Sequence, residues 1–239
     1  MQTNHHLPEN TLEKAKNLSF TFFVAVFFSF LPLTYAETEI TSASSAPSPN
    51  STSSASPSLT SSDPITSSLF GEDIVTLSAE TAGLCSINNP NDYIYLPQLI
   101  TIGWQLDEIS NEGWNRGNTE FLFSGMFGPV VQGPNPWFAG GLFGPRYNFV
   151  QEGWPVVPYL ESRVGFMFTH ATGASYSQGQ DFCFSFTIGF GARFPIADKF
   201  AINLGVMYQH ISNGGLSEPG SQNVGLDAIG PVLSATYAF

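Results

Sequence analysis

A histidine and a serine stand two residues apart at the end of an alternating apolar segment, INLGVMYQHIS (202–212). Its apolar face consists of Ile202, Leu204, Val206 and Tyr208, and the same face continues to His210 and Ser212. Side chains at positions i and i+2 of a strand project to the same side, so the imidazole and the hydroxyl lie near enough to interact. An imidazole that accepts the hydroxyl proton turns serine into a nucleophile toward esters.

The surroundings of this pair favour a catalytic role over a structural one. A polar pair that faces hydrocarbon costs free energy, whereas a structural histidine or serine would point into a polar interior. The next residues are Asn213, Gly214 and Gly215. Glycines permit a tight turn whose backbone N–H groups can stabilise an oxyanion. We therefore predict that His210 and Ser212 are catalytic and that the Asn-Gly-Gly turn contributes to oxyanion and substrate binding.

The elements that position this pair are predicted to be strands. The segment 181–193, DFCFSFTIGFGAR, places phenylalanine and other apolar side chains on one face and Asp181 and Arg193 on the other. The same alternation recurs in 120–127, 141–149 and 159–168. Membrane-spanning strands are about 9–11 residues long, apolar toward lipid and polar toward the lumen. The pattern thus favours a membrane barrel over a soluble sandwich.

We expect strands at 73–84, 92–104, 117–130, 137–150, 155–168, 180–193, 198–212 and 223–239. These eight strands are an even number and match the smallest outer-membrane barrels. Closure of the sheet into a barrel leaves no exposed strand edge. The predicted fold class is therefore all-β, an eight-stranded antiparallel transmembrane β-barrel with the active site on its last two strands. The final residues, Tyr237 to Phe239, resemble the terminal strand of bacterial outer-membrane proteins.

The lumen of so small a barrel is filled by side chains. We expect an internal ion-pair network there, formed by charged residues on the polar strand faces: Glu120, Arg146, Glu161, Arg163, Asp181 and Arg193.

Three regions follow one another along the chain. Residues 1–36 resemble a signal peptide, with Lys14 and Lys16 before an apolar run and cleavage expected after Ala36. The alternative, a transmembrane anchor, needs about 20 apolar residues, more than this run supplies. Residues 37–70 are rich in Ser, Thr and Pro and are expected to be a disordered linker. Residues 71–239 form the predicted barrel.

Composition excludes several other classes of protein. The formal net charge is −12, so the chain lacks the basic surface that binds nucleic acid. No nucleotide or zinc motif is present, and we predict neither a cofactor nor a metal. Cys85 and Cys183 leave two alternatives open, a disulfide in an oxidising compartment or two unpaired thiols.

The site also resembles that of a known family. His210 to Leu216, HISNGGL, followed by Pro219 and Asn223, is similar to the active-site signature of the PagL lipid A 3-O-deacylase family. The upstream segments 146–149, 158–159 and 179–182 resemble the family's strands in the same order, and the resemblance covers roughly 92–239.

This resemblance implies an eight-stranded outer-membrane barrel that hydrolyses an ester-linked acyl chain of lipid A on its outer surface. It further implies Ser212 as nucleophile, His210 as base, and Asn213 and Gly215 as contributors to the oxyanion site. The expected partners are lipid A, lipopolysaccharide and outer-membrane lipid, and homo-oligomerisation is left open.

The third member of the triad departs from the family's pattern. The family's glutamate falls near Asn223 or Val224, and neither is a carboxylate. Asn223 would still orient an imidazole by accepting a hydrogen bond. Asp227 is the alternative: if Ser212 lies opposite Asn223, Asp227 is one diagonal step from His210. A bulge at Gly230-Pro231 would reverse that inference.

The competing hypothesis is a non-catalytic outer-membrane barrel whose extracellular loops bind a partner. A soluble ligand-binding barrel is a third option, which membrane fractionation would separate from the other two. Replacing Ser212 by alanine distinguishes the first two, because only an enzyme would lose lipid hydrolysis.

Overall fold

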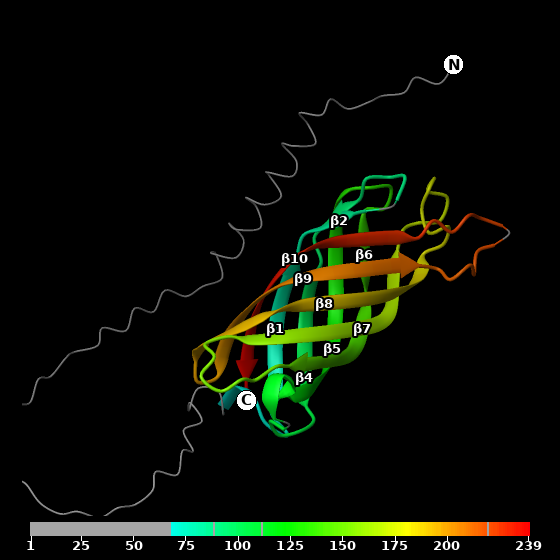
Figure 1. Cartoon of the computed structure of the whole chain (residues 1–239). Coiled ribbons are helices and arrows are strands. Elements are labelled where there is room, and N and C mark those ends of the chain that lie inside the picture. Colours follow the sequence, from blue (N-terminus) through cyan, green and yellow to red (C-terminus); the bar gives the residue numbers. More distant parts are fainter. Residues whose placement is uncertain (1–67, 88, 111, 219) are drawn as a thin grey trace, which may run out of the picture. The chain divides into compact units, whose positions relative to one another are not determined.

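The computed structural model describes residues 68–87, 89–110, 112–218 and 220–239. The predicted signal peptide (1–36) and residues 37–67 of the predicted linker lie outside the described residues. The described part of the chain contains a single antiparallel sheet, a short 3-10 helix, Gly113–Asn115, and two helical residues at its start, Ser68 and Leu69 (Figure 1). The strands are β1 (Val75–Ala82), β2 (Leu84–Ser86), β3 (Ile94–Tyr95), β4 (Gln98–Gln105), β5 (Asn118–Gln132), β6 (Trp137–Asn148), β7 (Val157–Thr169), β8 (Phe182–Ala197), β9 (Phe200–Ser212) and β10 (Leu226–Ala238).

The sheet closes into an eight-stranded barrel, as predicted. β1 pairs with both β4 and β10, and β5 to β9 follow in order around the ring. Gly83 separates β1 from β2, and Leu96-Pro97 separates β3 from β4. Each of these pairs forms one interrupted strand of the barrel. Between β3 and β4, proline at position 97 lacks the N–H that a continuous ladder would need.

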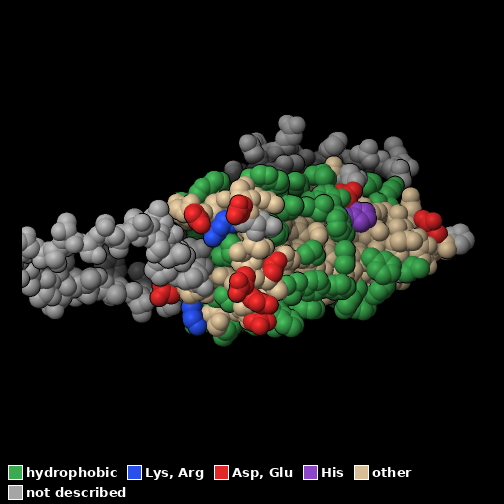
Figure 2. All heavy atoms as spheres, turned by 60° about the horizontal axis from the view of Figure 1, so that its bottom comes forward, with side chains coloured by type: hydrophobic (Ala, Val, Ile, Leu, Met, Phe, Trp, Pro, Cys, Tyr) green, Lys and Arg blue, Asp and Glu red, His purple; other side chains and the backbone are tan. Residues whose placement is uncertain are grey.

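Side chains alternate between the outside and the inside of the barrel. Along β8, Phe184, Phe186, Ile188 and Phe190 are exposed on the outside, whereas Cys183, Ser185, Thr187 and Arg193 are buried. Hydrophobic side chains cover the flank of the molecule in Figure 2. This apolar exterior and polar interior suit a strand barrel surrounded by lipid. No helix in the described part of the chain is long and apolar enough to cross a membrane.

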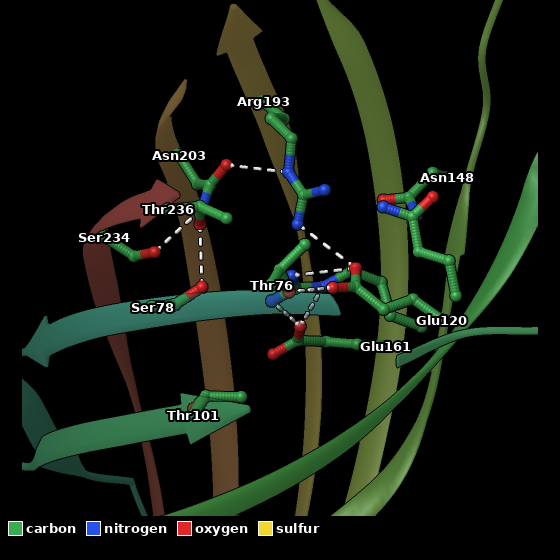
Figure 3. A network of polar contacts seen from close by, with 12 residues as sticks. Thr76, Ser78, Thr101, Glu120, Asn148, Glu161, Arg193, Asn203, Ser234 and Thr236 are labelled. Atoms are coloured by element: carbon green, nitrogen blue, oxygen red, sulfur yellow. Dashed lines mark hydrogen bonds and ion pairs between the residues drawn. The ribbon is translucent and has the colours of Figure 1, made fainter. Parts of the chain in front are cut away.

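An ion-pair network fills the interior, and all of its members are buried. Arg146 Nη2 lies 2.6 Å from Glu161 Oε2, and Arg163 Nη2 lies 2.8 Å from Glu161 Oε1. Arg193 Nη2 lies 3.2 Å from Glu120 Oε2. Figure 3 shows Arg193 and Glu120 joined in this way. The predicted network therefore exists, with two differences in its members.

Asp181 was expected in this network but lies outside it, because β8 begins only at Phe182. Its carboxylate accepts hydrogen bonds of 2.9 Å from the backbone N–H groups of Ala171 and Thr172 and from the Thr172 hydroxyl. These bonds, with those from Thr172 the strongest, hold the pKa of Asp181 below its usual value. Glu80 of β1 joins the network instead, 3.0 Å from Arg163 Nη2.

The first described residues close one mouth of the barrel. Leu69 and Phe70 are buried in a cluster with Val150 and Val157. Gln105 Nε2 donates to the Leu69 carbonyl at 2.7 Å. Leu69 and Phe70, which the predicted boundary at residue 71 places in the linker, therefore pack against residues of the barrel.

The other mouth is covered by hairpin loops that bind one another. Ser177 donates to Asn135 Oδ1 at 2.8 Å, and Asn91 Nδ2 donates to the Tyr176 carbonyl at 3.0 Å. The Val224 N–H donates to the Ser177 carbonyl at 3.0 Å. Both cysteines are free thiols, Cys85 exposed and Cys183 buried, so the disulfide alternative is wrong.

Candidate active site

His210 and Ser212 lie on the outer face of β9, at the end of the strand that meets the hairpin loops. The register places Phe186 of β8 opposite His210 and Phe184 opposite Ser212. The His210 side chain is 40% exposed. Both polar side chains therefore face the outside of the barrel, among aromatic neighbours, at the end of the strand.

Asp227 of β10 lies directly opposite His210. Its Oδ1 atom is 2.6 Å from His210 Nδ1, and its side chain is only 17% exposed. The expected register placed these residues one diagonal step apart. The β9–β10 ladder runs without interruption through Gly230 and Pro231, so the bulge considered there is absent. The register differs by two residues from the expected one, with Leu226 opposite Ile211.

Asn223, the other candidate partner for the imidazole, lies elsewhere. Its Oδ1 atom accepts the N–H of Asn213 at 3.2 Å, so it holds the turn that follows Ser212. Gly225, which directly precedes β10, also lies close to the pair. A Cβ atom at Gly225 would stand 3.3 Å from His210 Cε1 and 3.8 Å from Ser212 Cβ, so a larger side chain there would crowd both groups.

The turn after β9 is fixed by the buried side chain of Asn213. Its Nδ2 atom donates to the Gln178 carbonyl and to the Ser217 hydroxyl, each at 2.6 Å. Its Oδ1 atom accepts the Gly215 N–H at 2.7 Å. The Asn213 amide is therefore occupied within the protein and serves as a clamp between two loops.

Gly214 directs its backbone N–H toward the serine. The Gly214 nitrogen lies 3.4 Å from Ser212 Oγ. Gly214 and Gly215 have φ angles of 65° and 81°, which side chains with a Cβ atom rarely adopt. The two glycines thus permit the tight turn that aims a backbone donor at the hydroxyl.

A shallow apolar groove of about 720 Å³ begins at His210 and crosses the outside of the barrel. Its lining side chains come from β6, β7 and β8: Phe143, Val164, Phe166, Phe168, Phe182, Phe184 and Phe186. The rings of Phe168 and Phe182 pack edge to face with centroids 5.5 Å apart. A groove of this apolar character suits a hydrocarbon chain.

Two contributions to the site were not predicted. Tyr208 donates to Asp227 Oδ1 at 2.5 Å, although its place on the apolar face of β9 had suggested only contact with lipid. Gln178 and Ser217 hold Asn213, which no spacing in the sequence indicates. Among the residues that the structure describes, no cluster of histidine, cysteine and carboxylate side chains could hold a metal ion.

The family model described as lipid A 3-O-deacylase (PagL) matches residues 97–236, more than half of the chain and the whole of this site. The chain belongs to the PagL lipid A 3-O-deacylase family. Membership makes it a β-barrel protein of the bacterial outer membrane, from an enzyme family that acts on lipid A. No curated protein matches it significantly in sequence.

Solved structures similar to this PagL family member are outer-membrane barrels of low sequence identity. The crystal structure of the outer membrane enzyme PagL is 19% identical, with a TM-score of 0.47, covering 66% of this chain and 97% of that one. Neisserial surface protein A is 13% identical, with a TM-score of 0.49, covering 70% and 100%. The N-terminal β-barrel domain of Pseudomonas aeruginosa OprF is 16% identical, with a TM-score of 0.42, covering 71% and 99%.

Proposed function

We propose that the protein is an outer-membrane serine esterase that hydrolyses an ester-linked acyl chain of lipid A. In this proposal Ser212 is the nucleophile, His210 is the general base and Asp227 orients the imidazole. The observation that carries it is the 2.6 Å contact of His210 Nδ1 with Asp227 Oδ1, on the lipid-facing surface at the head of an apolar groove.

The geometry supports a separate role for each of the three side chains in the first step. We assign the Nδ1 proton of His210 to its bond with Asp227, which leaves Nε2 free to accept the Ser212 proton. The serine oxygen then attacks the carbonyl carbon of the acyl ester and forms a tetrahedral oxyanion. Collapse of this intermediate breaks the bond to the sugar oxygen. His210 returns its proton to that oxygen, and the acyl chain stays on Ser212.

The second step releases the acyl chain by the reverse proton movements. A water molecule gives a proton to His210 and attacks the acyl-serine carbonyl. The fatty acid leaves, and Ser212 recovers its proton. The site lies at the end of β9, where the polar head of a lipid meets its chains, so both water and ester can reach it.

In both steps the oxyanion needs a hydrogen-bond donor that is not already used. The Asn213 N–H is bound to Asn223, and the Gly215 N–H is bound to the Asn213 side chain. The Gly214 N–H points to the serine hydroxyl and is the donor that we assign to the oxyanion. We assign Asn213, Gly215 and Asn223 to holding this turn in place.

The apolar groove supports an acyl chain as the part of the substrate that is bound. Its phenylalanine side chains lie on the same outer face as Ser212, so a chain in the groove would present its ester near the hydroxyl. Such positioning contributes to rate because the reacting groups are held together before the chemical step.

The test is mass spectrometry of lipid A from Gram-negative cells that express the wild type, Ser212→Ala or Ser162→Ala. Ser162 is a serine on the outer face of β7 and serves as the matched control. We expect the wild type and Ser162→Ala to remove one acyl mass, and Ser212→Ala to remove none. If the wild type reaches the outer membrane but lipid A stays unchanged, the assay is repeated with purified lipids. Absence of hydrolysis in both assays would instead support a non-catalytic barrel.

A further inference from the structure

We propose that Tyr208 is a positioning residue of this site, whose hydroxyl fixes the Asp227 carboxylate in the orientation that holds His210. This inference rests on the proposed function, in which Asp227 orients the catalytic imidazole. It adds a fourth side chain to the constellation, one that acts on the reaction through Asp227 rather than by touching the substrate.

The first observation is a shared acceptor atom. The Tyr208 hydroxyl donates to Asp227 Oδ1 at 2.5 Å, and His210 Nδ1 lies 2.6 Å from the same oxygen. Tyr208 and His210 stand two residues apart on the outer face of β9, and Asp227 lies between their polar atoms from β10. Two donors on one strand therefore converge on one carboxylate oxygen of the next strand.

A second donor matters because a carboxylate can turn about its terminal torsion and exchange its two oxygens. A hydrogen bond from a phenol to an ionised carboxylate is short and strong, and it favours one orientation over the other. With Tyr208 bound to Oδ1, that same oxygen is kept facing the imidazole. The orientation of His210 is then set by a carboxylate that is itself held.

Tyr208 stands between an isoleucine on each neighbouring strand. The register places Ile188 of β8 and Ile229 of β10 on either side of Tyr208. Both isoleucines lie on the lipid-facing side, with 42% of each exposed. A buried or lipid-facing phenol normally finds a hydrogen-bond partner, and Asp227 is the partner here. The bond to Asp227 thus keeps the Tyr208 hydroxyl turned toward the site.

The apolar groove lies on the other side of His210 from this tyrosine. Its lining belongs to β6, β7, β8 and His210 itself, whereas Tyr208 meets Asp227 on the β10 side. Loss of the hydroxyl should therefore slow the chemical step and leave substrate binding nearly unchanged.

The experiment compares purified wild type, Tyr208→Phe, Asp227→Ala and the double variant in detergent micelles with lipid A as substrate. Tyr237→Phe, a lipid-facing tyrosine at the opposite end of β10, is the matched control. We expect Tyr208→Phe to lower kcat about 10-fold to 100-fold, as for loss of a hydrogen bond to a charged group. KM should stay within about twofold, and Tyr237→Phe should match the wild type.

The double variant separates positioning from other roles. If Tyr208 acts through Asp227, adding Tyr208→Phe to the Asp227→Ala variant causes no further loss of kcat. Full additivity, a raised KM with unchanged kcat, or wild-type activity of Tyr208→Phe would each overturn the proposal. So would an activity loss that only follows a loss of folded protein, measured by circular dichroism. Absence of lipid A hydrolysis by the wild type would instead refute the proposed function on which this inference depends.

Discussion

Replacing Glu120 by glutamine tests whether the internal ion network stabilises the barrel as a balanced set of charges. Glu120 is fully buried, and its Oε2 atom faces Arg193 Nη2 at 3.2 Å and Arg146 Nη1 at 3.5 Å. Its Oε1 atom accepts the Thr76 hydroxyl at 2.5 Å. Glutamine keeps the shape but removes the charge, so the arginines would retain one positive charge with no counterion in the lumen.

The expected cost follows from this burial. Removing one partner of a buried ion pair destabilises a protein by about 3–5 kcal/mol, because the remaining charge stays desolvated. With a urea dependence of about 2 kcal/mol per molar, the unfolding midpoint should fall by roughly 1.5–2.5 M. A second substitution, Arg193→Met, removes the unpaired charge and should restore a large part of this loss.

Urea unfolding in detergent micelles, followed by tryptophan fluorescence, measures this effect. The matched control is Glu152→Gln, since Glu152 is 82% exposed and lies 3.7 Å from Arg116. An exposed pair of this kind contributes at most about 1 kcal/mol. Equal stability of Glu120→Gln and Glu152→Gln would contradict a stabilising charge balance, and so would a further loss of stability when Arg193→Met is added to Glu120→Gln.

Three further outcomes are expected. Asp227→Asn should lower kcat by about 10² to 10⁴ in the purified enzyme with the fold intact, because an amide that turns its NH2 group toward Nδ1 favours the other tautomer of the imidazole; near-normal activity would exclude its orienting role. Phe166→Ala should raise KM for lipid A about five- to tenfold, through loss of roughly 50 Å² of apolar contact; an unchanged KM would place the acyl chain outside the groove. Asp181 has a lowered pKa, so its stabilisation of the 170–181 loop is present above its usual pKa and lost as the pH falls through the lowered one. Pepsin should therefore spare the loop near pH 4 and cut it at lower pH, whereas Asp181→Asn should be cut at both; equal cleavage of the two proteins would contradict this.

The strands could be predicted because one pattern repeats in nearly all of them. Apolar side chains at every second position of β8 left no helical interpretation, and eight such segments required closure. The members of the interior network were harder to assign, because a single charge reveals its face only when the strand boundary is known. Asp181 falls one residue before β8. Glu80 lies in β1, whose sequence VTLSAETA shows only a weak contrast between its apolar and polar faces.

The outward direction of His210 and Ser212 could be predicted because alternate residues of a single strand point to the same side of the sheet. Their cross-strand partner could not, because the number of residues in the turn between β9 and β10 decides the register. Asp227 was therefore placed two residues away from its position in the structure. The clamp on Asn213 comes from Gln178 in a different hairpin, and a contact of that sequence separation leaves no local signal.

Ser212 should behave as an activated nucleophile on the lipid-facing surface. The most direct measurement treats the purified protein in micelles with a long-chain alkyl p-nitrophenyl phosphonate, which phosphonylates activated serines, and locates the adduct by peptide mass spectrometry. We expect one adduct, on the peptide that contains Ser212, and we expect His210→Ala to form it much more slowly. A folded wild type that stays unlabelled, or is labelled on another serine, would contradict this role of Ser212.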